Sequence, residues 1–313
     1  MGALINVVVP VFGIILTGYL AGRFEALGPE SAAALNRFVF YFALPCALFI
    51  FTARAPVDKI FNWPFIGALV IGALLTLLIA LIVGRLLFHH HDVATLSMIG
   101  LTASWGNYGY MGLPLLLTAY GPDGALPTVV ATFSGIIFLV AGAIVLLEGT
   151  RVSEPSPLRV AAYLASTLLR NPLVISPVLG IVFSMGALPL PKVAGNYLDL
   201  MAAAVAPAAL FALGLSLVGH KLMGNVGEVI WLAVLKALVN PILTFLLVTY
   251  VFAMDPLWSQ AAVLLSAMPV AVNVYVIAQQ YNVYFRTVSS VIIASTVISI
   301  ATIFFWLIWF GVR

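Results

Sequence analysis

Apolar residues run along this chain in stretches of about twenty, separated by short polar turns. A helix needs about 20 mostly apolar residues to cross the hydrocarbon core of a bilayer, and a window of that length finds ten candidates. They predict ten transmembrane helices over residues 4–21, 35–53, 64–87, 94–119, 127–148, 171–187, 197–219, 228–252, 258–280 and 287–311. The sixth is the least regular, because Pro172 and Pro177 interrupt it.

The composition agrees with this pattern. The 313 residues are 64% hydrophobic and only 7% charged, with a mean hydropathy of +1.19, whereas about a quarter of a soluble domain is charged. We therefore expect an all-α integral membrane protein. The net charge of +3 is spread over short loops and indicates no nucleic-acid partner. The amino end lacks the basic start of a cleaved signal peptide, so we expect it to form the first membrane helix.

The distribution of Lys and Arg predicts the orientation. The loops after odd-numbered helices hold eight of these residues, and the opposite side holds four. We expect the protein to lie in the inner (cytoplasmic) membrane of a cell. Because cytoplasmic loops are enriched in Lys and Arg, both termini are expected on the outer side of that membrane. The longest connection, residues 150–170, is then a cytoplasmic linker.

The two halves of the chain resemble each other, which predicts a duplication of residues 1–149 in residues 171–313. Three strings recur in the same order: PVFGIILTG from Pro10 as PVLGIVFSMG from Pro177, ALPCALF from Ala43 as VAPAALF from Val205, and LLTLLI from Leu74 as ILTFLL from Ile242. Five helices are an odd number, so the second copy enters the membrane from the opposite side. Such inverted-topology repeats are associated with secondary transporters. Duplication in a structural membrane protein is the alternative.

The fourth helix of each repeat contains residues that break helices. Proline removes a backbone donor and clashes with the preceding turn, and glycine lets another backbone approach closely. In hydrocarbon, freed peptide groups cost several kcal/mol each unless protein or a water-filled cavity satisfies them. The paired breaks therefore predict a shared polar cavity near mid-membrane. The residues concerned are Gly106, Asn107, Gly109, Gly112 and Pro114 in the first copy, and Pro269 and Asn273 in the second.

The second half of each broken helix would start a new helix, with Pro114 in a first-turn position. Two new N-termini would then point free N–H groups and positive dipole ends into the cavity, which suits a carboxylate. Asn107 and Asn273 would add side-chain amides at the same depth; the alternative is that each only caps a broken helix. Tyr108 and Met111 would line the cavity, and packing is their alternative role.

Lys236 is the one charge well inside a predicted helix, and Asn240 follows it on the same face. An intramembrane ionisable residue is a functional candidate. Lys236 would bind a carboxylate, exchange a proton or hold helix ends together; the alternative is that it extends to the membrane surface. No Asp or Glu lies at mid-depth, so an acidic proton relay or a carboxylate-based sodium site has no candidate.

Enzyme and metal motifs are absent from the sequence. The triplet from His89 to His91 follows the third helix and is expected to be solvated, because consecutive residues do not face one way. We therefore expect no catalysis, no cofactor and no metal ion.

The two broken helices resemble those of the auxin efflux carrier family, which includes bacterial malonate-type transporters and the plant PIN-formed auxin carriers. The residues that carry the resemblance are GNYGYMGLPLLLTAYG, from Gly106 to Gly121, and AMPVAVNVYVIAQQYNV, from Ala267 to Val283. The likeness extends across the chain.

The resemblance implies an architecture similar to bile-acid symporters and sodium–proton antiporters, in which broken helices 4 and 9 cross. Helices 1, 2, 6 and 7 would form a scaffold and a homodimer, while helices 3–5 and 8–10 would carry substrate in an elevator motion. The family's substrate contacts carry over to Asn107, Pro114 and Pro269. The plant carriers have proline at Gly106 and Asn273 and lysine at Gln279, and these departures favour a small carboxylate.

The sequence thus predicts a secondary transporter of a small organic anion, a dicarboxylate such as malonate or malate. Two alternatives remain: efflux of auxin-like aromatic monocarboxylates, and a receptor or structural protein without transport.

Overall fold

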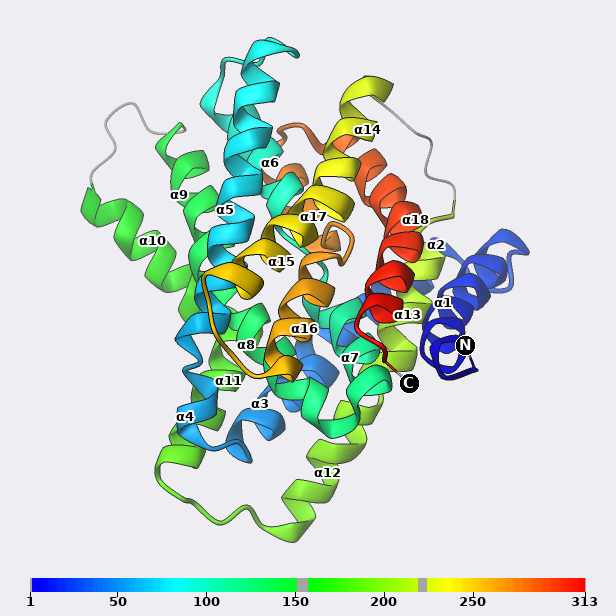
Figure 1. Ribbon diagram of the computed structural model, residues 1–313, viewed down its shortest axis with the longest axis vertical. Helices are drawn as coiled ribbons and strands as arrows, with labels where there is room; N and C mark the ends of the chain where they lie inside the picture. Colours follow the sequence, from blue (N-terminus) through cyan, green and yellow to red (C-terminus); the bar gives the residue numbers. More distant parts are fainter. Residues whose placement is uncertain (1, 151–156, 219–223, 313) are drawn as a thin grey trace.

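A computed structural model describes residues 2–150, 157–218 and 224–312, and these fold into packed helices (Figure 1). Among the described residues, the one β-bridge joins Gly106 and Val270. Six helices are long and apolar enough to cross a membrane, and a seventh is added if the bent pair α10 (Pro157–Arg170) and α11 (Pro172–Met185) forms one span. The prediction of an all-helical membrane protein is confirmed.

Every predicted apolar stretch is helical, although several helices contain π-helical turns or break. The first half contains α1 (Gly2–Arg23), α2 (Pro29–Phe38), π-turn η1 (Val39–Ala43), α3 (Leu44–Ala53), α4 (Val57–Ile60), α5 (Trp63–Leu86), α6 (Val93–Ser104), π-turn η2 (Tyr108–Gly112), α7 (Leu113–Tyr120), 3₁₀-turn η3 (Gly121–Gly124), α8 (Ala125–Gly135), π-turn η4 (Ile136–Val140) and α9 (Ala141–Gly149). After α10 and α11, the second half contains α12 (Lys192–Ala203), α13 (Val205–Ser216), α14 (Val226–Val234), π-turn η5 (Leu235–Val239), α15 (Asn240–Tyr250), α16 (Pro256–Ser266), α17 (Val272–Tyr281) and α18 (Phe285–Trp309).

Two sequence expectations about the middle of the chain need correction. The linker over residues 150–170 contains helix α10, which bends by 73° into α11. The prolines of the sixth stretch do not interrupt it. Pro172 is the first residue of α11, where its missing N–H is not needed, and the Asn171 side chain caps the helix by accepting from the Leu173 amide at 2.9 Å. Pro177 lies inside α11 without ending it.

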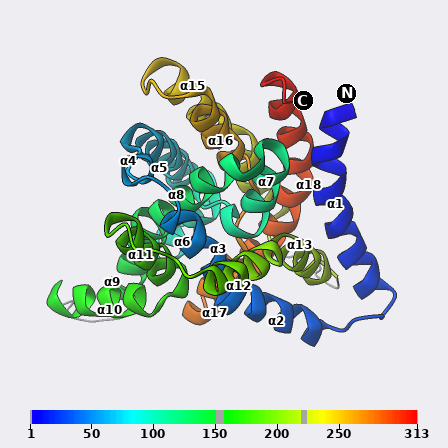
Figure 2. The same cartoon turned by 90° about the horizontal axis from the view of Figure 1, so that it is seen from below.

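The two halves of the chain are packed into each other. Helix α1 packs on α13, and α3 packs on α11. A Cβ on Gly214 of α13 would lie 2.0 Å from the Ile15 carbonyl oxygen of α1, so the two backbones touch. Figures 1 and 2 show the chain termini side by side. They lie toward the end of the molecule that carries α4 and α12, here named the α4 end; the opposite end, with the α5–α6 connection, is named the α5 end (Figure 1).

A partly buried histidine–glutamate pair ties three connections together at the α5 end. His90 Nε2 lies 2.8 Å from Glu228 Oε1 in the first turn of α14, and only 6% of the Glu228 side chain is exposed. The Tyr284 ring packs edge-on against His90 with centroids 5.8 Å apart. Burial and the neighbouring Glu228 carboxylate raise the pKa of Tyr284 above its usual value. The sequence predicted that the histidine triplet is solvated. His90 is instead partly buried and paired with Glu228.

Glu228→Ala is expected to lower the free energy of unfolding by about 2 kcal/mol, because a hydrogen bond to a charged group contributes about 1.5–3 kcal/mol. Thermal unfolding of the purified protein measures this. Asp255→Ala, which removes an exposed carboxylate that makes no cap hydrogen bond to α16, is the matched control and should lower stability by less than about 1 kcal/mol, the value of a charge at a helix N-terminus. Equal stabilities for the two variants would show that the His90–Glu228 pair is not stabilising.

Candidate functional site

The two broken helices meet where α6 and α16 end. The extended segments that follow them run antiparallel, with Gly106 facing Val270. The Asn107 amide donates to the Pro269 carbonyl at 2.8 Å, and the Ala271 amide donates to the Trp105 carbonyl at 3.3 Å. Each break thus satisfies part of the other's freed backbone, as buried peptide groups require. The breaks form one unit, named the crossing below.

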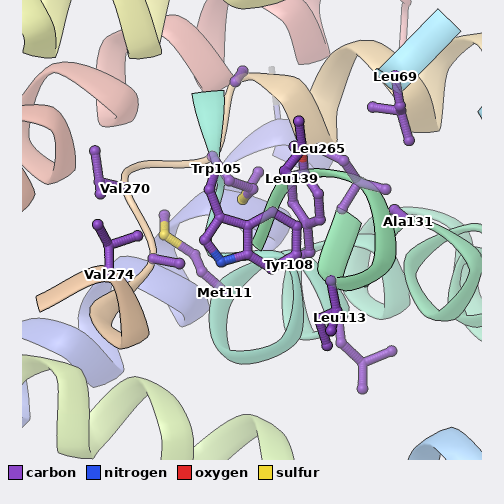
Figure 3. Packing of buried hydrophobic residues seen from close by; sticks show 14 of the residues in the cluster. Leu69, Trp105, Tyr108, Met111, Leu113, Ala131, Leu139, Leu265, Val270 and Val274 are labelled. Atoms are coloured by element: carbon purple, nitrogen blue, oxygen red, sulfur yellow. The ribbon is translucent and has the colours of Figure 1, made fainter. Parts of the chain in front are cut away.

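An aromatic cluster fixes the crossing from one side. Trp105 Nε1 donates to Asn273 Oδ1 at 2.9 Å, and the Tyr108 ring packs edge-on against Trp105 with centroids 4.9 Å apart. Figure 3 shows both rings packed beside Met111. Tyr108 is 3% exposed and Met111 is fully buried. In this structure both side chains belong to the packed core around the crossing.

Asn107 carries a polar group that the structure leaves unpaired. The residue is 5% exposed, and within the described chain its Nδ2 has no hydrogen-bond partner. It does not cap η2, which begins at the next residue, and Asn273 does not cap α17, since its Oδ1 accepts from Trp105. The capping alternative is therefore wrong for both. A buried donor without an acceptor costs about 1–3 kcal/mol, so the Asn107 amide needs a functional explanation.

The helix starts that follow the breaks add backbone donors. In the part of the chain that the structure describes, no hydrogen bond forms at the amides of Gly109 and Tyr110 in η2, or of Val272 and Asn273 in α17. These are the free N–H groups expected in a first turn. They carry the positive end of the helix dipole.

The position of Pro114 differs from the expectation. The amides of Met111 and Gly112 both donate to the Asn107 carbonyl, at 3.2 and 3.0 Å, so the new helix begins directly at Tyr108. Pro114 therefore lies in the second turn, as the second residue of α7. A wide π-turn explains this, because the Leu113 amide bonds five residues back, to the Tyr108 carbonyl.

A cavity of about 580 Å³ is lined by the α1–α2 connection, the end of α13 and the first turn of α17, which follows the crossing. Residues of α1, α2 and α13 line one part of it, and residues of α17 and α18 line the rest. Asn107 does not line it. The sequence did not single out its polar residues outside the crossing, because isolated polar residues in apolar helices form no motif. The polar side chains that line it are Glu25, Asn36, Ser216, Tyr275 and Ser289.

Lys236 and Asn240 do not line this cavity. Lys236 is 0% exposed and Asn240 is 1% exposed. Lys236 Nζ donates to the Ser266 carbonyl oxygen at 2.6 Å, and Asn240 Nδ2 lies 3.4 Å from the Ser104 carbonyl oxygen. The alternative that Lys236 extends to the membrane surface is therefore wrong. Among the described residues, no three His, Cys, Asp or Glu side chains are grouped to hold a metal ion.

Comparison with known proteins identifies the family of this chain. A family model described as "Membrane transport protein" matches residues 3–307, including both broken helices. The chain belongs to this family. The match confirms the resemblance to the auxin efflux carriers, and it makes the protein a membrane transport protein.

Individual relatives cover nearly the whole chain. A Rhizobium meliloti (strain 1021) protein named "Putative malonate transporter" is 33% identical over 97% of this chain and 94% of its own length. An Escherichia coli (strain K12) protein named "Uncharacterized transporter YfdV" is 28% identical over 95% of each chain. The Mus musculus "Lysosomal cholesterol signaling protein" is 26% identical over 96% of this chain and 37% of its own length.

Proposed function

We propose that this membrane transport protein is a secondary transporter of a small organic anion, with a dicarboxylate such as malonate or malate as substrate. The observation that carries the proposal is the unpaired Asn107 Nδ2, buried at the crossing. A carboxylate oxygen would satisfy it. The name of the R. meliloti relative supports the same substrate class.

The local electrostatics also favour an anion. The first turns of η2 and α17 offer free amides at the positive ends of two helices, and helix N-termini bind anions. The acidic residues nearest in sequence to the broken helices lie at the ends of those helices away from the breaks: Asp92 precedes α6, Asp123 lies in η3 after α7, and Asp255 precedes α16. A carboxylate at the crossing would therefore meet donors and no carboxylate from these positions.

The proposed architecture is ten membrane helices in two inverted five-helix repeats, residues 1–149 and 171–313. The paired breaks support it, and termini that lie side by side fit an even number of crossings (Figure 1). Helices α1–α3 and α11–α13 pack on one another, as do α5, α6 and α14–α18. We assign the first group to a dimerising scaffold and the second, with α7–α9, to a domain that moves as an elevator.

We infer that this conformation opens to the cytoplasm. The α1–α2 connection that lines the 580 Å³ cavity follows the first membrane helix, on the side that the Lys and Arg distribution predicts to be cytoplasmic. Toward the α4 end, a pocket of about 140 Å³ between α3, α8 and α11 has apolar walls. Its Thr52 and Ser134 hydroxyls donate to carbonyls of their own helices. The substrate would therefore exchange with the cytoplasm in this state, within an inner membrane with both termini outside.

Thermal unfolding of the purified protein with a panel of carboxylates tests the function. A ligand at a hundred times its dissociation constant should stabilise the protein by about 2.7 kcal/mol. Malonate or malate is expected to raise Tm, and malonamide, which has the same shape without charge, is not. A larger shift with indole-3-acetate would favour aromatic monocarboxylates instead. If no carboxylate shifts Tm, the anion proposal fails and a receptor or structural role gains support.

A further inference from the structure

The crossing contains two helix C-termini as well as two helix N-termini. The N-termini favour an anion, whereas the C-termini favour a cation. Helices α6 and α16 both end there, and each C-terminus carries about half a negative charge and carbonyls without helical partners. In α16 the carbonyls of Val263 and Leu265 accept from the Ala267 and Met268 amides. The Ser266 carbonyl is left for a donor from elsewhere.

One segment supplies donors to both helix ends. Lys236 in η5 donates to Ser266 of α16 at 2.6 Å, and Asn240, at the start of α15, approaches Ser104 of α6 at 3.4 Å. The π-turn between them depends on Pro241, which has no amide to bond the carbonyl four residues back; the Asn240 amide bonds to Leu235 instead. The wider turn directs the two side chains to different helix ends.

Lys236 has no acidic partner on any helix packed against η5. These helices are α5, α6, α14, α15 and α18, together with α16, which Lys236 contacts at Ser266, and their one acidic residue is Glu228. Glu228 lies about 12 Å along the helix from Lys236 by the 1.5 Å rise per residue, and it is paired with His90. The only other basic side chains on these helices, Arg85 and Arg286, lie at helix ends. Lys236 Nζ therefore faces the carbonyl end of α16 and no carboxylate of these helices.

We propose that the Lys236 ammonium is a built-in cation that occupies the carbonyl end of α16, where a coupling cation would otherwise bind, with Asn240 as its uncharged counterpart at α6. The role in coupling rests on the proposed transport function. Lys236 is a positioning residue, because it contacts the helix end rather than the cavity. The crossing is then complete without sodium, and η5 holds both broken helices as one body.

Adding a small ammonium ion to a variant that lacks the Lys236 side chain tests this assignment without any substrate. Lys236→Ala removes the charge and leaves space, so we expect Tm to fall by about 10 °C, as when a buried charged partner is lost. Ethylammonium chloride should restore most of that loss, whereas choline chloride at the same concentration should not, because choline is too large. The wild type and Lys59→Ala, which removes an exposed lysine, should respond to neither salt.

Lys236→Met separates charge from packing, because methionine fills space without a charge. A Lys236→Met variant as stable as the wild type would overturn the proposal. Equal responses of Lys236→Ala to ethylammonium and choline would also overturn it, as would a rise of the wild-type Tm with sodium chloride over choline chloride. Since no carboxylate enters these measurements, the built-in cation can fail while the anion site stands, and the reverse.

Discussion

Asn107→Ala is expected to reduce transport of the substrate by about 10- to 150-fold while leaving the protein as stable as the wild type, or more so. Hydrogen bonds to charged groups contribute about 1.5–3 kcal/mol, and the Asn107 side chain offers one to a carboxylate. In the empty protein the same Nδ2 is buried and unpaired. Alanine removes that unsatisfied donor, so stability without substrate should rise by about 1 kcal/mol.

Counterflow in proteoliposomes, together with thermal unfolding, measures both effects. The Asn107 backbone amide keeps its bond to Pro269, so the crossing should persist in the variant. Asn196→Ala, on an exposed position of α12, is the matched control and should change neither measurement. A variant that loses transport and stability together would mean that Asn107 holds the crossing rather than the substrate. Wild-type transport rates would remove Asn107 from the site.

The main features of the fold were predictable because bilayer crossing imposes a simple pattern. Long apolar stretches gave the helices, and paired prolines and glycines located the breaks. The contact between the breaks was not predictable from composition, since Asn107 pairs with Pro269 through backbone atoms that carry no sequence signal. The π-turns were missed for the same reason. They depend on bonds five residues back, and they moved Pro114 out of the first turn.

The candidate site was predictable in its residues and less so in their roles. Lys236 and Asn240 were found as polar residues on one apolar helix. Their carbonyl partners, Ser266 and Ser104, could only come from tertiary structure. The cavity wall formed by Asn36 and Ser216 combines two helices far apart in sequence, and neither residue stands out by itself.

The bent helix α8–η4–α9 offers a test of the crossing that uses two glycines. Gly135→Ala is expected to reduce transport by more than about 10-fold and to destabilise the protein by about 1–3 kcal/mol, the usual cost of overpacking a core. A Cβ on Gly135 would lie 1.9 Å from Cζ3 of Trp105. Trp105 is 3% exposed, so its ring can move only by disturbing Tyr108 or by losing the hydrogen bond to Asn273.

Gly142→Ala is the matched control, because a Cβ there meets no atom within 4 Å. Glycine is less favourable than alanine inside a helix by about 0.8–1 kcal/mol, so this variant should be as stable as the wild type or slightly more stable, with full transport. The same substitution, seven residues apart in one bent helix, is thus expected to change stability in opposite directions. Thermal unfolding and counterflow of both variants provide the measurement. If Gly135→Ala behaves like Gly142→Ala, Trp105 does not hold the crossing rigidly, and the transport activity cannot depend on the packing of its ring against α8.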